Sequence, residues 1–120
     1  MGKDMHEKQT KKIWKIRTVK NYPEAHNHLL IGEVLEIEKS YVCLNCKTYH
    51  FGRSINGTKD VVVGEVNIRI LPWNRIEIIN ELPVSFDYVN AVLDVEEKHK
   101  IILKDKQFKC AVASSYDSRY

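Results

Sequence analysis

Apolar and polar residues alternate along most of the chain, and this period of two is typical of strands with one buried face. β-Branched and aromatic residues fill the alternating segments, whereas glycine, proline and charged clusters separate them. No long segment shows the period of an amphipathic helix. The pattern predicts five longer strands over 13–19, 28–38, 41–51, 61–71 and 75–79, and shorter ones over 88–95, 101–103 and 108–112.

One stretch predicts two strands that meet at a sharp corner. Ile68 and Ile70 alternate with polar residues, which predicts that their side chains face the core. Pro72 then breaks the pattern, because proline donates no backbone hydrogen bond and fixes its own φ. Ile76 and Ile78 resume the alternation beyond this corner.

Glycine lies inside two predicted strands, at Gly32 and Gly64, and each is followed by Glu and Val. Glycine in a strand is typical of a bend or bulge, where a residue without Cβ is needed. Five short, bent strands predict a small closed or nearly closed barrel. We assign residues 1–12 to a flexible basic arm, 13–82 to the barrel, and 83–120 to a C-terminal β extension and loose tail of the same domain.

Two segments resemble the motifs of the Sm-like (LSm, Hfq) barrel family. The second family motif resembles Gly64-x-Val66-x-Ile68-Arg69 followed by Ile76-x-x-Ile79, and the first half of the first motif resembles Gly32-x-Val34-x-x-Ile37-Glu38. The resemblance covers about residues 13–80 and implies a mainly β fold, a five-stranded, strongly bent Sm-like (SH3-type) barrel with extra C-terminal strands. A generic small barrel that shares this alternation by chance is the alternative.

The first motif leaves two registers for the third strand. Without a gap its core positions fall on Tyr41, Cys43 and Asn45, and with one extra residue in the preceding turn they fall on Val42, Leu44 and Cys46. A slip of one residue exchanges the two faces of a strand. Because burying Asn45 without partners costs about 1–3 kcal/mol, we expect the second register.

The resemblance also implies single-stranded RNA as a partner. In the family an aromatic residue stacks on a base, an Asn reads the base edge and an Arg closes the pocket; these positions fall on Tyr41, Cys43 and Arg69. Cys43 cannot make the two hydrogen bonds of an amide, and Ile70 stands where the family has glycine. The fourth strand of one family subunit pairs with the fifth of the next, which implies a homo-oligomer.

Positive charge gathers at the start of the chain. Residues 1–20 carry seven Lys or Arg and two acidic residues, a net charge of +5 within a chain of net charge +3. Lys11, Lys12 and Lys15 are therefore candidate contacts to RNA phosphates. The alternative is a solvated terminus that aids solubility.

Other reactive side chains predict no chemistry. Cys43-x-x-Cys46 followed by His50 has zinc-ligand types, but residues three apart in a strand face opposite sides, so a site needs a turn between the cysteines. His26-x-His28 is interpreted as exposed polar surface. No catalytic spacing stands out, so we expect a protein that is not an enzyme and has no cofactor or metal.

Composition bears on where the protein is located and on whether it has disulfides. The chain is 43% hydrophobic and 29% charged, and it has neither a run of about 18 apolar residues nor a signal peptide, so we expect a cytoplasmic protein without a membrane partner. Three cysteines and no export signal argue against a disulfide framework. The leading hypothesis is a non-enzymatic, oligomeric Sm-like protein that binds RNA or another polyanion. The alternative is a structural or protein-interaction barrel without a nucleotide pocket.

Overall fold

The computed structural model describes residues 10–20, 27–51, 58, 61–96 and 100–114. This part of the chain is mainly β, with antiparallel pairing throughout. The strands are β2 (Ile13–Thr18), β3 (Asn27–Ile37), β4 (Tyr41–Phe51), β5 (Val61–Val63), β6 (Asn67–Pro72), β7 (Ile76–Leu82), β8 (Val92–Glu96), β9 (Lys100–Lys104) and β10 (Lys109–Ser114). Within it, no helix has the length and apolar character that a membrane crossing requires.

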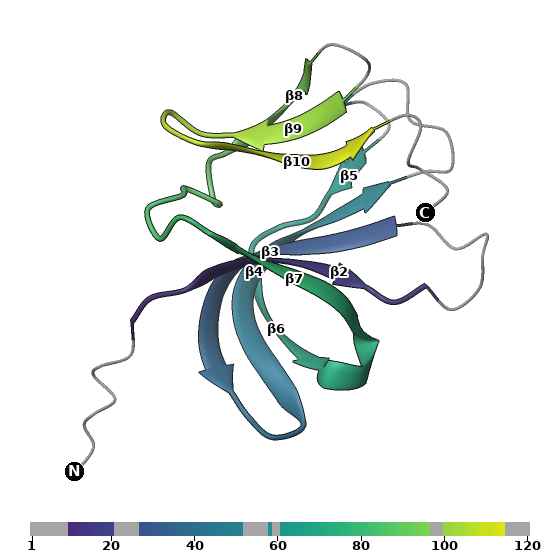
Figure 1. Cartoon of the computed structure of the whole chain (residues 1–120), viewed down its shortest axis with the longest axis vertical. Helices are drawn as coiled ribbons and strands as arrows, with labels where there is room; N and C mark the ends of the chain where they lie inside the picture. Colours follow the sequence, from purple (N-terminus) through teal and green to yellow (C-terminus); the bar gives the residue numbers. More distant parts are fainter. Residues whose placement is uncertain (1–9, 21–26, 52–57, 59–60, 97–99, 115–120) are drawn as a thin grey trace.

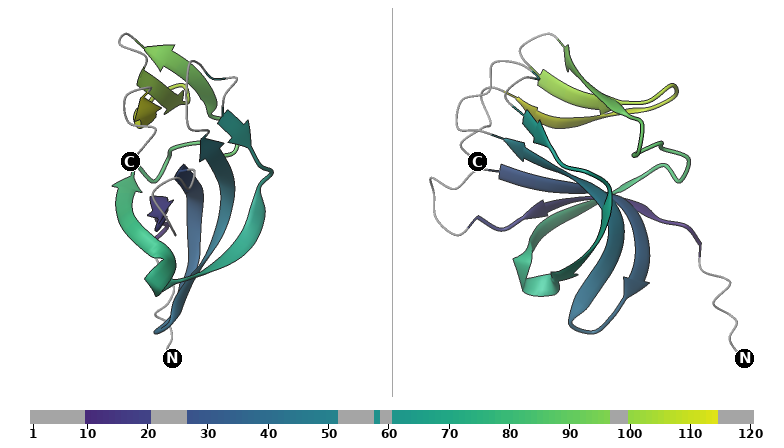
Figure 2. Two further views of the ribbon diagram at one scale, coloured as in Figure 1. Left: turned by 90° about the vertical axis from the view of Figure 1, so that its right-hand side faces the viewer. Right: turned by 180° about the vertical axis from the view of Figure 1, so that it is seen from behind.

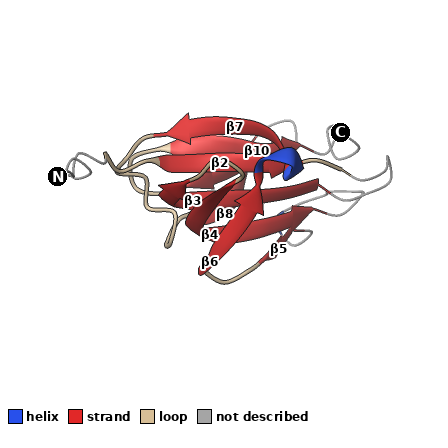
Figure 3. Cartoon of the chain, turned by 90° about the horizontal axis from the view of Figure 1, so that it is seen from below, coloured by secondary structure: helices blue, strands red, loops and turns tan. Residues whose placement is uncertain are grey.

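Six strands form the larger sheet, in the order β5-β4-β3-β2-β7, with β6 also paired to β4. Figure 1 shows these strands fanning out from a common crossing region, and Figure 2 shows how strongly they curve. A single 3-10 turn, η2 (Trp73–Arg75), follows Pro72 and joins β6 to β7, as the blue helix in Figure 3 shows. The corner predicted at Pro72 is therefore confirmed. Of the predicted closed or nearly closed barrel, the mainly β fold is confirmed, but the described strands form no closed barrel, because β6 and β7 do not pair with each other.

The C-terminal strands form a separate three-stranded sheet in the order β10-β9-β8, which lies across one end of the larger sheet (Figure 1). The three expected strands are present, but β8 begins at Val92 rather than at residue 88. Residues 84–91 form turns instead of the start of that strand. These turns place Phe86, Tyr88 and Ala91 against the core, so their apolar character reflects packing of a connection and not a strand.

The larger sheet has an apolar core on each face. We call the face that carries Val42, Leu44 and Cys46 the inner face; these three side chains are fully buried with Ile16 and Leu30. The opposite, outer face packs against the C-terminal sheet. This outer core joins the two sheets through the buried residues Ile13, Leu29, Ile31, Tyr49, Phe51, Val61, Phe86, Tyr88, Ala91, Ile101 and Leu103.

A β-bulge explains the register of β4. Val34 pairs with Leu44 and Glu36 pairs with Cys43, so Leu35 is an extra residue in β3. The expectation that Val42, Leu44 and Cys46 face the core is confirmed. The extra residue lies in the strand before the turn rather than in the turn itself.

The expected burial of Ile68 and Ile70 is wrong. Their side chains are 66% and 63% exposed, because β6 pairs with β4 so that Ile70 lies opposite Cys43 on the outer face. Arg69, opposite Leu44, takes the inner face instead. The alternation predicted beyond the corner also fails at Ile78, whose side chain is 45% exposed. The cause is a shift of one residue in the pairing of β7 with β2, where Arg17 pairs with Ile78 and Thr18 with Ile76.

Candidate functional site

The residues expected to form an RNA-base pocket lie on two faces. Tyr41 and Cys43 project from the outer face of β4 and are half-buried, whereas Arg69 lies on the inner face. One chain therefore does not bring Tyr41 and Arg69 into a single pocket. Nearby acidic residues, with Glu36 the largest influence, raise the pKa of the Tyr41 hydroxyl, so this position is better suited to stacking than to binding an anion.

The basic residues of the first strand also lie apart from Arg69. The Lys15 ammonium donates a hydrogen bond to the backbone oxygen of Ala111 at 2.7 Å on the outer face, and it thereby links β2 to β10. The backbone oxygen of Lys12 accepts a hydrogen bond from the Val34 amide at 2.9 Å. Lys11 is exposed. Of the three, Lys15 thus has a clear structural role.

The site with the most suitable chemistry is a hollow of about 380 Å³ at one end of the inner face. We call it the basic hollow. Its walls come from β2, β3, β4, β6 and η2, and they consist of Thr18, His28, Leu30, Thr48, Arg69, Ile70, Leu71 and Arg75. Two guanidinium groups, an imidazole and two hydroxyls thus meet in one place, and the described residues that line it include no carboxylate.

Backbone carbonyls hold Arg69 in place. Its Nη1 donates to the oxygen of Cys46 at 2.7 Å and to that of Asn67 at 3.3 Å, and its Nη2 donates to the oxygen of Glu65 at 3.3 Å. The Cys46 carbonyl belongs to β4, whereas those of Glu65 and Asn67 lie where the chain leaves β5 and enters β6. Arg69 therefore ties β4 to this connection. A guanidinium has five N–H donors, more than these contacts use, so it can also donate to a ligand in the hollow.

His28 lines the basic hollow with a ring nitrogen that is buried and has no hydrogen-bond partner among the described residues. It pairs across the sheet with His50, and the two rings stack with centroids 4.0 Å apart and planes 21° apart. The buried nitrogen is its Nε2. Burial, followed by the charges of His50 and Arg69, lowers the pKa of His28 to about 4.

Sequence reasoning found Arg69 but missed His28 and Arg75. The expectation that His28 is exposed surface is wrong, because it is half-buried on β3; His26 lies outside the described residues. The sequence does hold a sign of this placement. His28 lies two residues before Leu30 in the same strand, so both side chains point to the inner face. The position of Arg75 depends on η2, which carries no comparable pattern.

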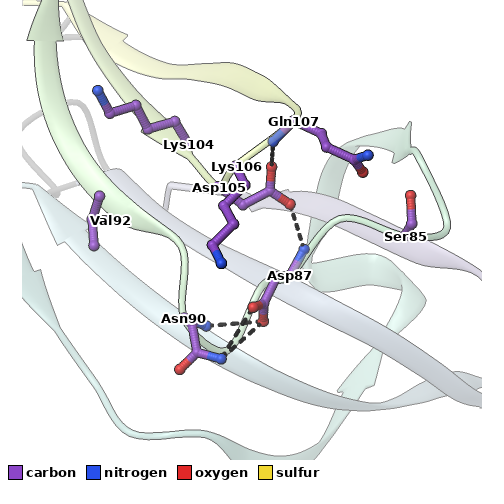
Figure 4. A pocket seen from close by; sticks show the side chains of 8 residues that line it. All are labelled: Ser85, Asp87, Asn90, Val92, Lys104, Asp105, Lys106 and Gln107. Atoms are coloured by element: carbon purple, nitrogen blue, oxygen red, sulfur yellow. Dashed lines mark hydrogen bonds between the residues drawn. The ribbon is translucent and has the colours of Figure 1, made fainter.

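A second hollow, of about 580 Å³, lies beside the C-terminal sheet (Figure 4). Its two carboxylates already have partners. Asp105 accepts hydrogen bonds from the backbone amides of Asp87 and Gln107, both at 2.8 Å, and Asn90 donates to Asp87 at 3.0 Å. Hydrogen bonds from Asn90 to Asp87, and from the Asp87 amide to Asp105, hold the pKa of each carboxyl group below its usual range. These groups stabilise the turns and offer little to a ligand.

A metal centre is not supported in the described part of the chain, where no three His, Cys, Asp or Glu side chains gather closely enough to hold an ion. Cys43 and Cys46 lie on opposite faces of the continuous strand β4, as their spacing predicts. Cys46 is fully buried in the inner core. The turn that a zinc site would require between the cysteines is therefore absent.

Comparison with known proteins found no match among family models, curated proteins or solved structures.

Proposed function

We propose that this protein is a non-enzymatic, Sm-like protein that binds single-stranded RNA or a similar polyanion at the basic hollow. The observation that carries the proposal is that the cationic side chains of Arg69 and Arg75 line the same hollow. Two guanidinium groups in one hollow favour phosphate over neutral ligands. Thr18 and Thr48 add hydroxyls that can donate to phosphate oxygens.

The arrangement of the strands supports the Sm-like part of the proposal. Six bent, antiparallel strands, β2 to β7, run through the region of resemblance, and a tight corner at η2 separates the last two. The motif that includes Gly64 and ends at Arg69 leads directly into the hollow. On this proposal the sheet is an Sm-like barrel that stays open between β6 and β7. Its RNA contact differs from the family arrangement, because Tyr41 lies on the other face.

RNA binding is tested by fluorescence anisotropy with uridine-rich and adenine-rich oligomers at several salt concentrations. We expect micromolar binding that weakens with salt, since phosphate contacts release counterions. Arg69→Gln should weaken binding several-fold and reduce the slope of log K against log salt by about 0.7. Arg75→Gln should act similarly, and it serves as the second variant because Arg69 also stabilises the backbone.

Arg17→Gln is the matched control. Arg17 lies on the outer face, where its Nε forms an exposed ion pair with Glu77 at 3.1 Å, so this variant removes the same charge away from the hollow. We expect its RNA affinity to match that of the unchanged protein. The proposal fails if no salt-sensitive binding occurs at micromolar protein, or if all three variants weaken binding equally.

A structural role in self-assembly is the second candidate. Ile68 and Ile70 are exposed on β6, which has a strand neighbour on one side only. An exposed apolar edge strand is a template for pairing with another chain. β7 ends the other side of the sheet and also has one neighbour. Pairing of β6 with β7 of a second copy would bury both edges and give a homo-oligomer.

A further inference from the structure

The basic hollow has a feature that phosphate attraction alone does not require. A histidine with a shielded, unpartnered Nε2 lines it next to Arg69. A polar atom that has no partner and is shielded from water lowers stability, so a ligand that supplies a partner for this atom would relieve that cost. The hollow is also near the lower end of the range of about 300–1,000 Å³ that small-ligand pockets occupy. It can hold one nucleotide-sized group rather than a run of polymer.

We propose that the basic hollow binds a single phosphate group, as a phosphate monoester or one nucleotide of a strand, and that binding is coupled to the uptake of a proton by His28. This inference rests on the proposed function and names its ligand chemistry and its dependence on pH.

The charges around His28 support this coupling. His50 stacks on it from β4, Arg69 approaches from β6 and Arg75 lines the same hollow from η2, while β2 contributes the neutral Thr18. In the empty site the partial burial of the ring, followed by the charges of His50 and Arg69, lowers the pKa of His28, so the imidazole is neutral at physiological pH. A dianion between the two guanidinium groups offsets their positive charge and brings negative charge close to the ring. The imidazolium then becomes favourable, so the anion and the proton bind together.

Linkage fixes the direction of the effect. The folded, empty protein holds fewer protons on His28 than the anion-bound protein over the range between the two pKa values. Anion affinity must therefore rise as the pH falls through that range. If a bound anion restores the ordinary histidine pKa of about 6.5, affinity at pH ~5.5 should exceed that at pH ~7.5 by roughly tenfold.

Sulfate is the best first probe, because its charge is constant over this range, whereas a phosphate monoester loses its second proton near pH ~6. Isothermal titration calorimetry at the two pH values, in two buffers of different ionisation enthalpy, gives both affinity and proton uptake. For the unchanged protein we expect roughly tenfold tighter binding at the lower pH, with close to one proton taken up. Uridine 5′-monophosphate should compete with sulfate.

Two variants locate the proton. His28→Gln keeps a hydrogen-bonding side chain but cannot titrate, so it should still bind sulfate at pH ~7.5 while losing the proton uptake. His50→Gln is the comparison variant: it removes a stacked imidazole that is not among the lining residues, and it should retain most of the uptake because His28 can still titrate. The Cε1–Hε1 NMR signal of His28, identified by its loss in His28→Gln, should titrate at higher pH with sulfate than without it.

The outcomes separate this inference from the proposed function. Sulfate binding with uptake on His28, but no RNA binding, supports the phosphate site and overturns the RNA function. RNA binding without sulfate competition supports the RNA function and overturns the phosphate site. Equal sulfate affinity at the two pH values, or unchanged proton uptake in His28→Gln, overturns the coupling.

Discussion

At the scale of single residues, Gly32 marks the closest approach between β3 and β4. A Cβ atom at this position would lie 2.1 Å from the backbone oxygen of Asn45 and 2.5 Å from the Cα of Cys46. Both are backbone atoms of the central strand pair, so neither can move without disturbing the ladder. The glycine that the sequence places inside the strand is therefore required by its neighbour, and the bulge itself falls three residues later, at Leu35.

We expect Gly32→Ala to lower the free energy of unfolding by about 3 kcal/mol, since an added methyl group overpacks the pair and forces the backbone apart. Gly64→Ala is the matched control. Its Cβ would lie 2.3 Å from a side-chain atom, Thr48 Oγ1, but 3.8 Å from the backbone oxygen of Thr48, so the ladder need not move and we expect a smaller loss of about 1 kcal/mol. Urea denaturation followed by circular dichroism measures both. Equal losses in the two variants would contradict this account.

Single residues also show how far burial and a place in the candidate site could be predicted from the sequence. The burial of Leu44 and Cys46 was predictable, because the alternative register would bury an amide. The exposure of Ile68 was not, since alternation shows that a strand has two faces but not which of them is covered. Arg69 was predictable as a site residue, whereas the stacking of His28 on His50 depends on a register that sequence alone does not fix.

At the scale of elements, the sequence predicted most strands to within a few residues, because Gly, Pro and charged turns separate them. It did not predict the break between β5 and β6, where the chain leaves the ladder of β4 and rejoins it farther along that strand. Nor did it decide between a closed and a nearly closed barrel, whereas the described strands leave the sheet open between β6 and β7. Closure depends on pairing between strands at opposite ends of the sheet, and local pattern carries no information about that pairing.

The open end at β6 leads to a prediction about assembly. Replacing Ile68 and Ile70 together by Lys should abolish oligomers, because charges on an edge strand oppose pairing with another chain. Since both side chains are mostly exposed, we expect the free energy of unfolding to change by less than about 0.5 kcal/mol. Light scattering measures the mass. Val92→Lys, an exposed position on the edge strand β8, should leave the mass unchanged.

A monomeric mass for the unchanged protein at high concentration would sink the assembly hypothesis. So would an unchanged oligomer in the variant with both lysines, because a contact through β6 could not tolerate them. A loss of mass in Val92→Lys alone would instead place the interface on the C-terminal sheet.

At the scale of the whole molecule, the two apolar cores share the strands of one sheet. Leu44 belongs to the inner core and Leu103 to the outer core, and both are fully buried. β2, β3 and β4 contribute residues to both cores. Side-chain hydrogen bonds also connect the layers, since the Asn45 amide donates to the Tyr88 hydroxyl at 3.0 Å.

This shared sheet predicts that the C-terminal extension unfolds together with the rest of the described chain. Leu44→Ala and Leu103→Ala should each lower the free energy of unfolding by about 2–5 kcal/mol, because each opens a cavity in a packed core. Val92→Ala, at an exposed position, should cost less than about 0.5 kcal/mol. If the two sheets form one cooperative unit, either core variant shifts a single transition, and circular dichroism and tryptophan fluorescence report the same midpoint. Of the two cores formed by the described residues, Trp14 and Trp73 pack against the inner one. A second unit would therefore be visible as a Leu103→Ala transition that moves by circular dichroism but not by fluorescence.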